Sequence, residues 1–229
     1  MRANLRAIGG KNMLSEWEIK LNVRPPTIRG EKMNLSSILK TINKKDRVFK
    51  LNPDYPTIRY IDDDEYNREV YKYVEPNFTE SITNPNAKFV LFSAPGATGK
   101  SALAKYVCNK MNGIYWDLPN NKVAEYSFQG AISEAVGIHN LGSFIESLKN
   151  EESFIVIDAF DEAEAGSGRT GIEFFLRDLN NMTIGCNTIS TILLARTETA
   201  VFIKKFFVEN SIAFNHYEVG YFSEYNAKN

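Results

Sequence analysis

The segment FSAPGATGKSALAKY, from Phe92 to Tyr106, stands between a run of apolar residues and a stretch with helical spacing. Gly96 and Gly99 allow backbone angles that a side chain forbids, and they let an anion approach the main chain closely. Backbone N–H groups that point inward in such a loop form a nest for an anion, and the helix that follows adds its partial positive charge. The segment therefore predicts a phosphate-binding loop between a strand and a helix.

The same segment fits the P-loop motif G-x-x-x-x-G-K-S/T. APGATGKS, residues 94–101, matches it with Ala94 in place of the first glycine, where a small residue is the main requirement. In such a loop we expect Lys100 to reach the β and γ phosphates of a nucleotide and the Ser101 hydroxyl to bind Mg²⁺. A glycine-rich turn without a ligand is the alternative, but it does not explain why GKS, an apolar strand and a helix coincide.

Short apolar runs alternate with segments of helical spacing after Asn86. A short, nearly continuous apolar run is typical of a strand buried on both faces. Five such strands separated by helices predict an α/β fold, a three-layer sandwich in which helices cover both faces of a mostly parallel sheet. The expected strands are KFVLFS (88–93), GIYWDL (113–118), SFIVID (153–158), STILLA (190–195) and IAFNHYEVG (212–220). The expected helices are KSALAKYVCNKM (100–111), residues 129–136, residues 141–148, GIEFFLRDLNNM (171–182) and TETAVFIKKFF (197–207).

Residues 1–86 are polar, interrupted by proline and weakly periodic. We expect them to form an N-terminal extension of irregular or mixed structure, ahead of a core domain over residues 87–229. Within the extension, NLSSILKTI (34–42) predicts a short helix capped by Asn34, and YPTIRYI (55–61) alternates as a strand does. Because such a segment usually wraps around the nucleotide, three residues are candidates for the wall of an adenine pocket: Tyr55, Tyr60 and Ile61.

An acidic cluster follows the third expected strand in FIVIDAFDEAEA, residues 154–165. Asp158 comes directly after four apolar residues, where a Walker B carboxylate faces a magnesium-bound nucleotide, typically through a coordinated water. Asp161 and Glu162 are candidates to orient or deprotonate the water that attacks the γ phosphate. Glu162 is favoured for that task and Asp161 for supporting the metal shell or the loop. A solvated acidic loop is the alternative, which the pairing with the phosphate-binding loop disfavours.

Arg196 ends the fourth expected strand in STILLARTET, residues 190–199. In an open parallel sheet, ligands bind at the carboxyl ends of the strands. A guanidinium at this position is suited to contact the γ phosphate and to report its presence. The alternative is an arginine that merely begins a helix at the surface.

Other polar residues fit structural roles better. Arg169 lies in the glycine-rich EAGSGRTG and is expected to be a solvated loop residue, with an arginine finger as the alternative. Trp116 and Asp117 end the second strand, where core packing and helix capping are favoured over ligand contact. His139 and His216 have no metal-ligand spacing and are expected to be structural.

The composition narrows the class of protein. Of the 229 residues, 43% are hydrophobic and 24% charged, which is typical of a soluble globular protein. The 27 Lys and Arg residues nearly cancel the 28 Asp and Glu residues, so charge does not indicate nucleic-acid or membrane-surface binding. Cys108 and Cys186 lie far apart, and we expect buried thiols in a reducing cytoplasm. No apolar run approaches the ~20 residues of a membrane span.

Two motifs carry a resemblance to a known family. DAFDEA after the third strand and LLAR at the end of the fourth resemble the STAND class of P-loop ATPases, and within it the NACHT-like group. The resemblance implies the strand order 5-1-4-3-2, with ATP and Mg²⁺ as cofactors. It also implies that Asp158 holds the metal, that Asp161 and Glu162 serve hydrolysis, and that Arg196 senses the γ phosphate. The residues at which it implies ATP and Mg²⁺ binding are Ala94, Pro95, Gly96, Ala97, Thr98, Gly99, Lys100, Ser101 and Ala102.

The resemblance also carries expectations about the whole protein. Proteins of this class are typically multidomain switches, often in signalling or microbial defence, that self-associate in the ATP state. GYFSEYNAKN (220–229) matches the stretch where they pass into a helical lid, so we expect an ATPase domain cut from a longer protein. A minimal relative whose other parts come from partners is the alternative.

The sequence thus favours an ATP-binding, slowly hydrolysing switch domain. Two alternatives stay open, a nucleotide-binding scaffold without efficient hydrolysis and an AAA-type remodelling ATPase. A small-molecule kinase is disfavoured, because no acceptor pocket or arginine-rich lid is legible in the sequence.

Overall fold

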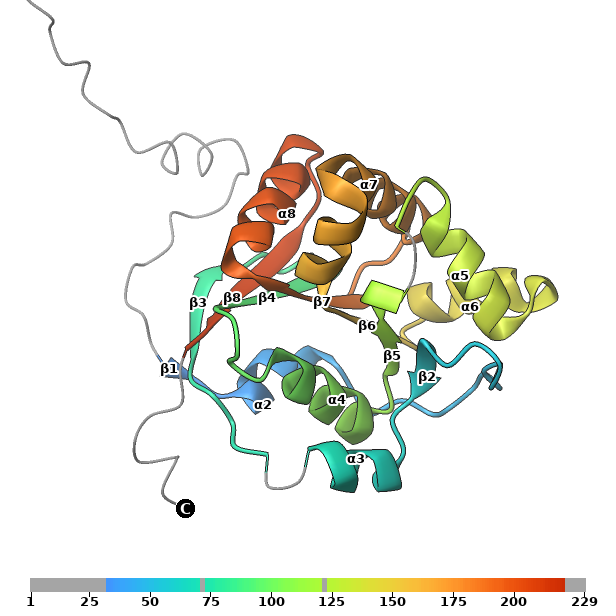
Figure 1. The fold of residues 1–229 in the computed structure, drawn as a ribbon, viewed down its shortest axis with the longest axis horizontal. Helices are drawn as coiled ribbons and strands as arrows, with labels where there is room; N and C mark the ends of the chain where they lie inside the picture. Colours follow the sequence, from blue (N-terminus) through green and yellow to red (C-terminus); the bar gives the residue numbers. More distant parts are fainter. Residues whose placement is uncertain (1–31, 71–72, 121–122, 221–229) are drawn as a thin grey trace, which may run out of the picture.

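A single sheet runs through the computed structural model, which describes residues 32–70, 73–120 and 123–220. Eight strands from these residues form it, in the order β1-β3-β8-β4-β7-β6-β5-β2 (Figure 1). The strands are β1 (Lys32–Met33), β2 (Ile58–Tyr60), β3 (Phe78–Ile82), β4 (Phe89–Ala94), β5 (Ile114–Asp117), β6 (Ile155–Asp158), β7 (Thr191–Arg196) and β8 (Phe214–Val219).

The centre of the sheet is parallel and its edges are antiparallel. The five expected strands are β4 to β8, and they lie next to one another as β8-β4-β7-β6-β5, all parallel. The predicted five-stranded sheet of order 5-1-4-3-2 is nevertheless wrong for the sheet as a whole. β3 pairs antiparallel with β8, β1 with β3, and β2 with β5, so that strands from residues 32–86 extend both edges.

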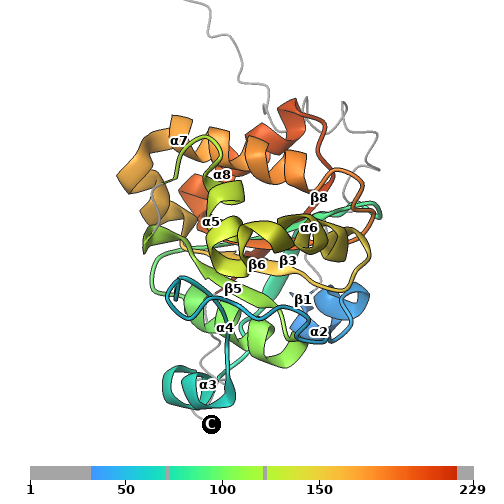
Figure 2. The ribbon, with the colours of Figure 1, turned by 90° about the vertical axis from the view of Figure 1, so that its right-hand side faces the viewer.

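Helices cover both faces of the sheet. In Figures 1 and 2, α7 and α8 lie on one face with α5 and α6, and α4 lies on the other with α2 and α3. The helices are α2 (Leu35–Ile38), α3 (Asp63–Glu69), α4 (Lys100–Met111), α5 (Ser127–Val136), α6 (Leu141–Lys149), α7 (Phe160–Met182) and α8 (Thr197–Glu209). Short 3₁₀ turns occupy η2 (Leu39–Thr41), η3 (Leu118–Asn120) and η4 (Ile138–Asn140).

Alternate residues of the central strands build two separate cores. On β4, Phe89 and Leu91 pack toward α7 and α8, whereas Val90 and Phe92 pack toward α4 and α2. Every residue of β4 and of β6 is buried. Burial on both faces explains why these strands read as continuous apolar runs.

Two elements of the N-terminal segment agree with the sequence. Asn34 caps α2, and its side chain accepts a hydrogen bond of 2.8 Å from the backbone N–H of Ser37. β2 lies inside the expected strand of residues 55–61. Among the described helices, none has the length and apolarity that crossing a membrane requires.

Helix α7 contains the helix expected over residues 171–182, and it corrects the expectation that the glycine-rich EAGSGRTG before it is a loop. It begins at Phe160 and continues to Met182, with one break at Gly168, where φ is 71° and ψ is 171°. Burial of Ile172 and Phe175 against the sheet holds the second half of the helix in place. Arg169, which we expected in a loop, therefore lies in α7 just after the break.

A buried histidine joins three strands. The ring of His216 on β8 is 0% exposed and lies between two serine hydroxyls, sharing a 2.8 Å hydrogen bond with Ser93 of β4 and another with Ser81 of β3. Burial, with a smaller contribution from the positive charge of Lys204, lowers the pKa of His216 to about 3. The ring is thus a neutral hydrogen-bonding link, which agrees with the structural role expected for it.

This link predicts a dependence of stability on pH. The folded protein keeps His216 neutral down to about pH 3, whereas the unfolded chain takes up the proton near pH ~6.5. Below that pH the unfolded state binds more protons, so His216 should lower the free energy of unfolding by up to about 1.4 kcal/mol per pH unit. Urea unfolding of His216→Gln should show a shallower loss of stability than wild type between about pH 6.5 and pH 4.5. His139→Gln, at an exposed position of η4, is the matched control for the loss of a histidine.

Candidate functional site

The loop between β4 and α4 folds back on itself. Ala97 and Gly99 have left-handed backbones, with φ of 59° and 76°. The carbonyl of Pro95 accepts a hydrogen bond of 2.8 Å from the hydroxyl of Thr98 and one of 3.4 Å from the ammonium of Lys100. Thr98 is only 3% exposed, so its hydroxyl fixes the loop from inside rather than facing solvent.

The start of α4 is suited to an anion. Its first turn contains no acidic side chain and begins with Lys100. The first N–H groups of a helix have no partner within the helix, and they carry the positive end of its dipole. A phosphate group is therefore favoured at this position.

Asp158 ends β6 beside this loop and is 1% exposed. Its Oδ2 accepts a hydrogen bond of 3.1 Å from the hydroxyl of Tyr115, and its Oδ1 accepts one of 2.8 Å from the backbone N–H of Ala159. The side chain of Ser101 lies close enough to this carboxylate to favour its charged form. Burial raises the pKa of Asp158 above its ordinary value, these three groups oppose that rise, and the charge of Asp117 adds to it.

The structure thus brings together Ser101 and Asp158, the two residues expected to bind a metal. In the parts of the chain that the structure describes, no group of three or more His, Cys, Asp and Glu side chains is placed to hold a metal ion. A hydroxyl and one carboxylate fit Mg²⁺, which takes most of its ligands from water and substrate phosphates. The residues present therefore fit this ion only in company with a phosphate ligand.

The register of the sheet gathers the candidate residues at one edge. Ala94 lies opposite Arg196 on β7, and Asp117 lies opposite Asp158. All four stand at the carboxyl ends of parallel strands, the edge at which open α/β sheets bind ligands.

Arg196 and Asp161 form an ion pair at this edge. The guanidinium Nε lies 2.6 Å from Asp161 Oδ2, and the backbone N–H of Arg196 donates to Oδ1 over 3.3 Å. The Arg196 side chain is 52% exposed, whereas that of Asp161 is 10% exposed. The arginine therefore faces solvent while the ion pair restrains it.

Glu162 stands beside this pair on the first turn of α7. A left-handed backbone at Ala159, with φ of 59°, turns the chain sharply between β6 and α7. Asp161 and Glu162 consequently lie in a helical turn, where acidic residues stabilise the positive end of the helix. Glu162 is exposed, in contrast to Asp161.

Two other candidates have partners outside this edge. The Nε of Arg169 lies 3.0 Å from Glu164, with 70% of the arginine side chain exposed, and its guanidinium stands 5.8 Å from the ring centre of Phe202. Trp116 is 0% exposed and packs against Phe128, which agrees with the core role expected for it.

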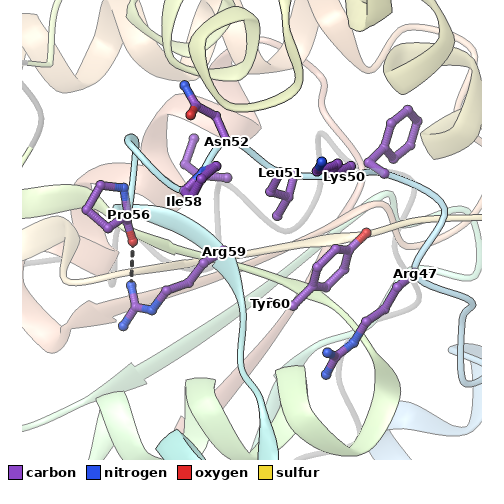
Figure 3. A pocket seen from close by; sticks show the side chains of 10 residues that line it. Arg47, Lys50, Leu51, Asn52, Pro56, Ile58, Arg59 and Tyr60 are labelled. Carbon is purple, nitrogen blue, oxygen red and sulfur yellow. Dashed lines mark hydrogen bonds between the residues drawn. The ribbon is translucent and has the colours of Figure 1, made fainter.

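The expected adenine wall is not gathered at the phosphate-binding loop. β2 is separated from β4 by β5, β6 and β7, and Ile61 after it is fully buried in the core. Tyr60 instead lines a pocket of about 420 Å³ (Figure 3). Its ring lies 5.1 Å from the guanidinium of Arg47, and Arg59 is turned toward the carbonyl of Pro56.

Tyr115 is the residue of this edge that the sequence reasoning missed. It lies on β5, and its side chain is buried on the α4 side of the sheet. The Asp158 carboxylate approaches Ser101 on the same side. The signal available in the sequence was a tyrosine in a short apolar strand. The next expected strand along the chain ends on Asp158.

Comparisons with known proteins do not assign this chain to a family. No family model matches the chain, and no curated protein matches it. Among solved structures, the C. elegans PCH-2 structure aligns with 18% identity and a TM-score of 0.36, over 61% of this chain and 37% of that chain. The chain thus spans well under half the length of that protein. The mixed α/β fold and the loop between β4 and α4 are consistent with a P-loop NTPase-like domain.

The left-handed backbone at Gly99 generates a prediction for stability. Gly99→Ala should lower the free energy of unfolding by about 1 kcal/mol, because a Cβ disfavours this conformation. Gly130→Ala is the matched control, since Gly130 lies inside α5 with no atom within 4 Å of the added Cβ. It should raise stability by about 0.5–1 kcal/mol. Urea unfolding measures both, and a gain in stability for Gly99→Ala would contradict the loop conformation.

Proposed function

We propose that this domain binds ATP with Mg²⁺ at the carboxyl edge of the sheet and hydrolyses it slowly, as the switch domain of a larger signalling or defence protein. The observation that carries the proposal is the proximity of the Ser101 side chain to the buried carboxylate of Asp158. It brings the start of the phosphate-binding helix to a buried carboxylate at the end of a parallel strand. That pairing is the one that a magnesium-bound triphosphate requires.

The residues of the loop have distinct tasks in this proposal. The backbone from Ala94 to Ala102 cradles the phosphates, and Lys100 exchanges its long hydrogen bond to Pro95 for the β and γ phosphates. Ser101 and Asp158 hold Mg²⁺, directly or through water. When bound, Mg²⁺ neutralises charge on the phosphate oxygens.

The acidic residues of α7 divide the remaining work. Asp161 is occupied by Arg196, whereas the neighbouring Glu162 is exposed. This arrangement favours Glu162 as the group that orients the attacking water, with Asp161 in a supporting role. Arg196 senses the γ phosphate by exchanging its contact with Asp161 for a phosphate oxygen.

The larger assembly belongs to the same proposal. A switch of this kind responds through further domains or protein partners, and it self-associates through the NTPase domain in the ATP state. If Arg196 exchanged Asp161 for a phosphate oxygen on ATP binding, the exposed end of β7 would change. A neighbouring copy that contacts this end would bind differently in the two states.

A second function, binding without efficient hydrolysis, is favoured by one observation. The ion pair between Arg196 and Asp161 occupies the group proposed to sense the γ phosphate and the group proposed to support hydrolysis. A domain that keeps this pair after binding ATP would act as a nucleotide-dependent scaffold. Single-turnover assays of the isolated domain separate the two functions, because hydrolysis by the domain alone excludes the scaffold.

The first functional prediction concerns Lys100. Lys100→Ala should lower the affinity for Mg²⁺-ATP in calorimetry by 100-fold or more, on the order of 3 kcal/mol, because it removes the cation that contacts the β and γ phosphates. Lys110→Ala, on the last turn of the same helix, is the control and should bind as wild type does. Undiminished binding by Lys100→Ala would show that the loop has been assigned wrongly.

The second prediction separates the two acids of α7. Glu162→Gln should keep nucleotide affinity within about twofold and reduce single-turnover hydrolysis by roughly 100-fold, because it removes the base that positions water. Asp161→Asn should reduce hydrolysis less, since its pairing with Arg196 is only supportive in this scheme. A larger loss for Asp161→Asn than for Glu162→Gln would reverse the two roles.

A further inference from the structure

Tyr115 holds one oxygen of the carboxylate that the proposed function assigns to the metal. The phenol is 2% exposed, and its hydroxyl donates to Asp158 Oδ2 over 3.1 Å. The other oxygen, Oδ1, is held by the N–H of Ala159. The terminal torsion of an aspartate is broad when nothing restrains it, so two donors on different oxygens fix the plane of the carboxylate.

Arg59 of the edge strand β2 holds the ring of Tyr115 in turn. Its guanidinium carbon lies 4.9 Å from the centre of that ring, a distance at which a cation is attracted to an aromatic face. The guanidinium is itself fixed by Glu65 of α3, at 2.6 Å and 3.1 Å, and by the carbonyl of Pro56, at 2.9 Å. Tyr115 is thus packed against a group that has little freedom to move.

The same segment reaches the other half of the metal site through α4. Lys105 lies 3.5 Å from Glu65, contacts Glu69, and stands 5.6 Å from the centre of the Tyr115 ring. It follows Ser101 by four residues on one helix, so the two side chains share a face of α4. Residues 58–69, which include β2 and α3, therefore contact α4, which carries Ser101, and Tyr115 of β5, which holds Asp158.

We propose that Tyr115, held by Arg59, is a positioning residue for Asp158, and that residues 58–69 thereby set the affinity of the nucleotide site for Mg²⁺. This inference rests on the proposed function. The hydroxyl keeps the carboxylate turned toward Ser101, and the arginine keeps the phenol from withdrawing. Outer partners of metal ligands commonly alter metal affinity by about 10- to 100-fold.

A consequence is that the segment and the metal site are linked in both directions. Whatever displaces Arg59 weakens Mg²⁺ binding, and Mg²⁺ bound with nucleotide stabilises the segment by the same factor, because coupling between binding sites is reciprocal. A partner that binds α3 would act on the switch through this route. Of the two carboxylates that bridge α3 to α4, that of Glu69 is the accessible one, with 41% of its side chain exposed against 12% for Glu65.

The experiment titrates Mg²⁺ at a fixed concentration of fluorescent ATP, with a parallel measurement in EDTA. Formation of Mg²⁺-ATP in solution is common to all variants and cancels in the comparison. Tyr115→Phe should raise the Mg²⁺ concentration for half-maximal binding by about 10-fold while nucleotide affinity in EDTA stays within twofold of wild type. Tyr106→Phe on α4, whose ring stacks on Tyr73, is the control and should shift neither quantity.

A second variant tests the link to β2. Arg59→Met keeps the length of the stem but removes the charge and the hydrogen bonds to Glu65. It should raise the half-maximal Mg²⁺ concentration about threefold, and combining it with Tyr115→Phe should add little to Tyr115→Phe alone, because the two act through one contact. If Tyr115→Phe fails to fold, Arg59→Met and Arg59→Lys carry the test, with Lys restoring part of the loss.

The outcomes separate the inference from the function beneath it. If wild type shows no Mg²⁺-dependent nucleotide binding, the proposed function fails. If wild type binds and Tyr115→Phe matches it, or loses affinity equally in EDTA and lowers the melting temperature, Tyr115 has no positioning role and the inference fails alone. Fully additive effects of the two substitutions would show that Arg59 does not act through Tyr115. They would overturn the role proposed for residues 58–69.

Discussion

The proximity of Ser101 to the buried carboxylate of Asp158 is the constraint on which the rest of the site depends. In the chain these residues are separated by β5, α5 and α6, and they meet because β4, β7 and β6 run parallel and end at one edge of the sheet. A buried carboxylate is costly unless donors surround it. Here the donors come from β5 and from the turn after β6, and the Ser101 side chain of α4 lies close by. The carboxylate of Asp158 keeps these partners only if three features coincide. The strands must follow this order, α4 must begin beside β6, and Tyr115 must lie on the face of β5 that packs against α4.

The central strands were predictable from sequence because they are buried on both faces. A strand such as β4 is apolar at nearly every position, and few other elements give that pattern. The edge strands could not be found in this way. β3 buries its first residue and exposes the next two, so its sequence FTESI resembles a polar loop. The glycine-rich part of α7 was misread for a different reason, because Gly166 and Gly168 disfavour a helix locally. Packing of the following apolar residues overrides that preference.

The candidate site shows the same division between local and distant information. The phosphate-binding loop is encoded in eight consecutive residues, APGATGKS, so its position follows from the motif. The ion pair between Arg196 and Asp161 joins β7 to α7 and depends on where the strand and the helix end in space. Tyr115 became visible only with the register of β5 against β6, since that pairing decides which side chains reach Asp158. The sequence of one strand does not show which side chains of the neighbouring strand contact it.

The two outermost strands of the sheet, β1 and β2, are two and three residues long. Strands this short present few unpaired main-chain groups, so they are poor templates for a strand from another molecule. Growth of copies through a continuous β ladder is thereby discouraged at both margins. Within the described residues, the helices that cover both faces offer larger surfaces for contacts among copies than these edge strands do, and helical surfaces can shift against each other by small amounts, whereas a shared ladder holds neighbours in one register.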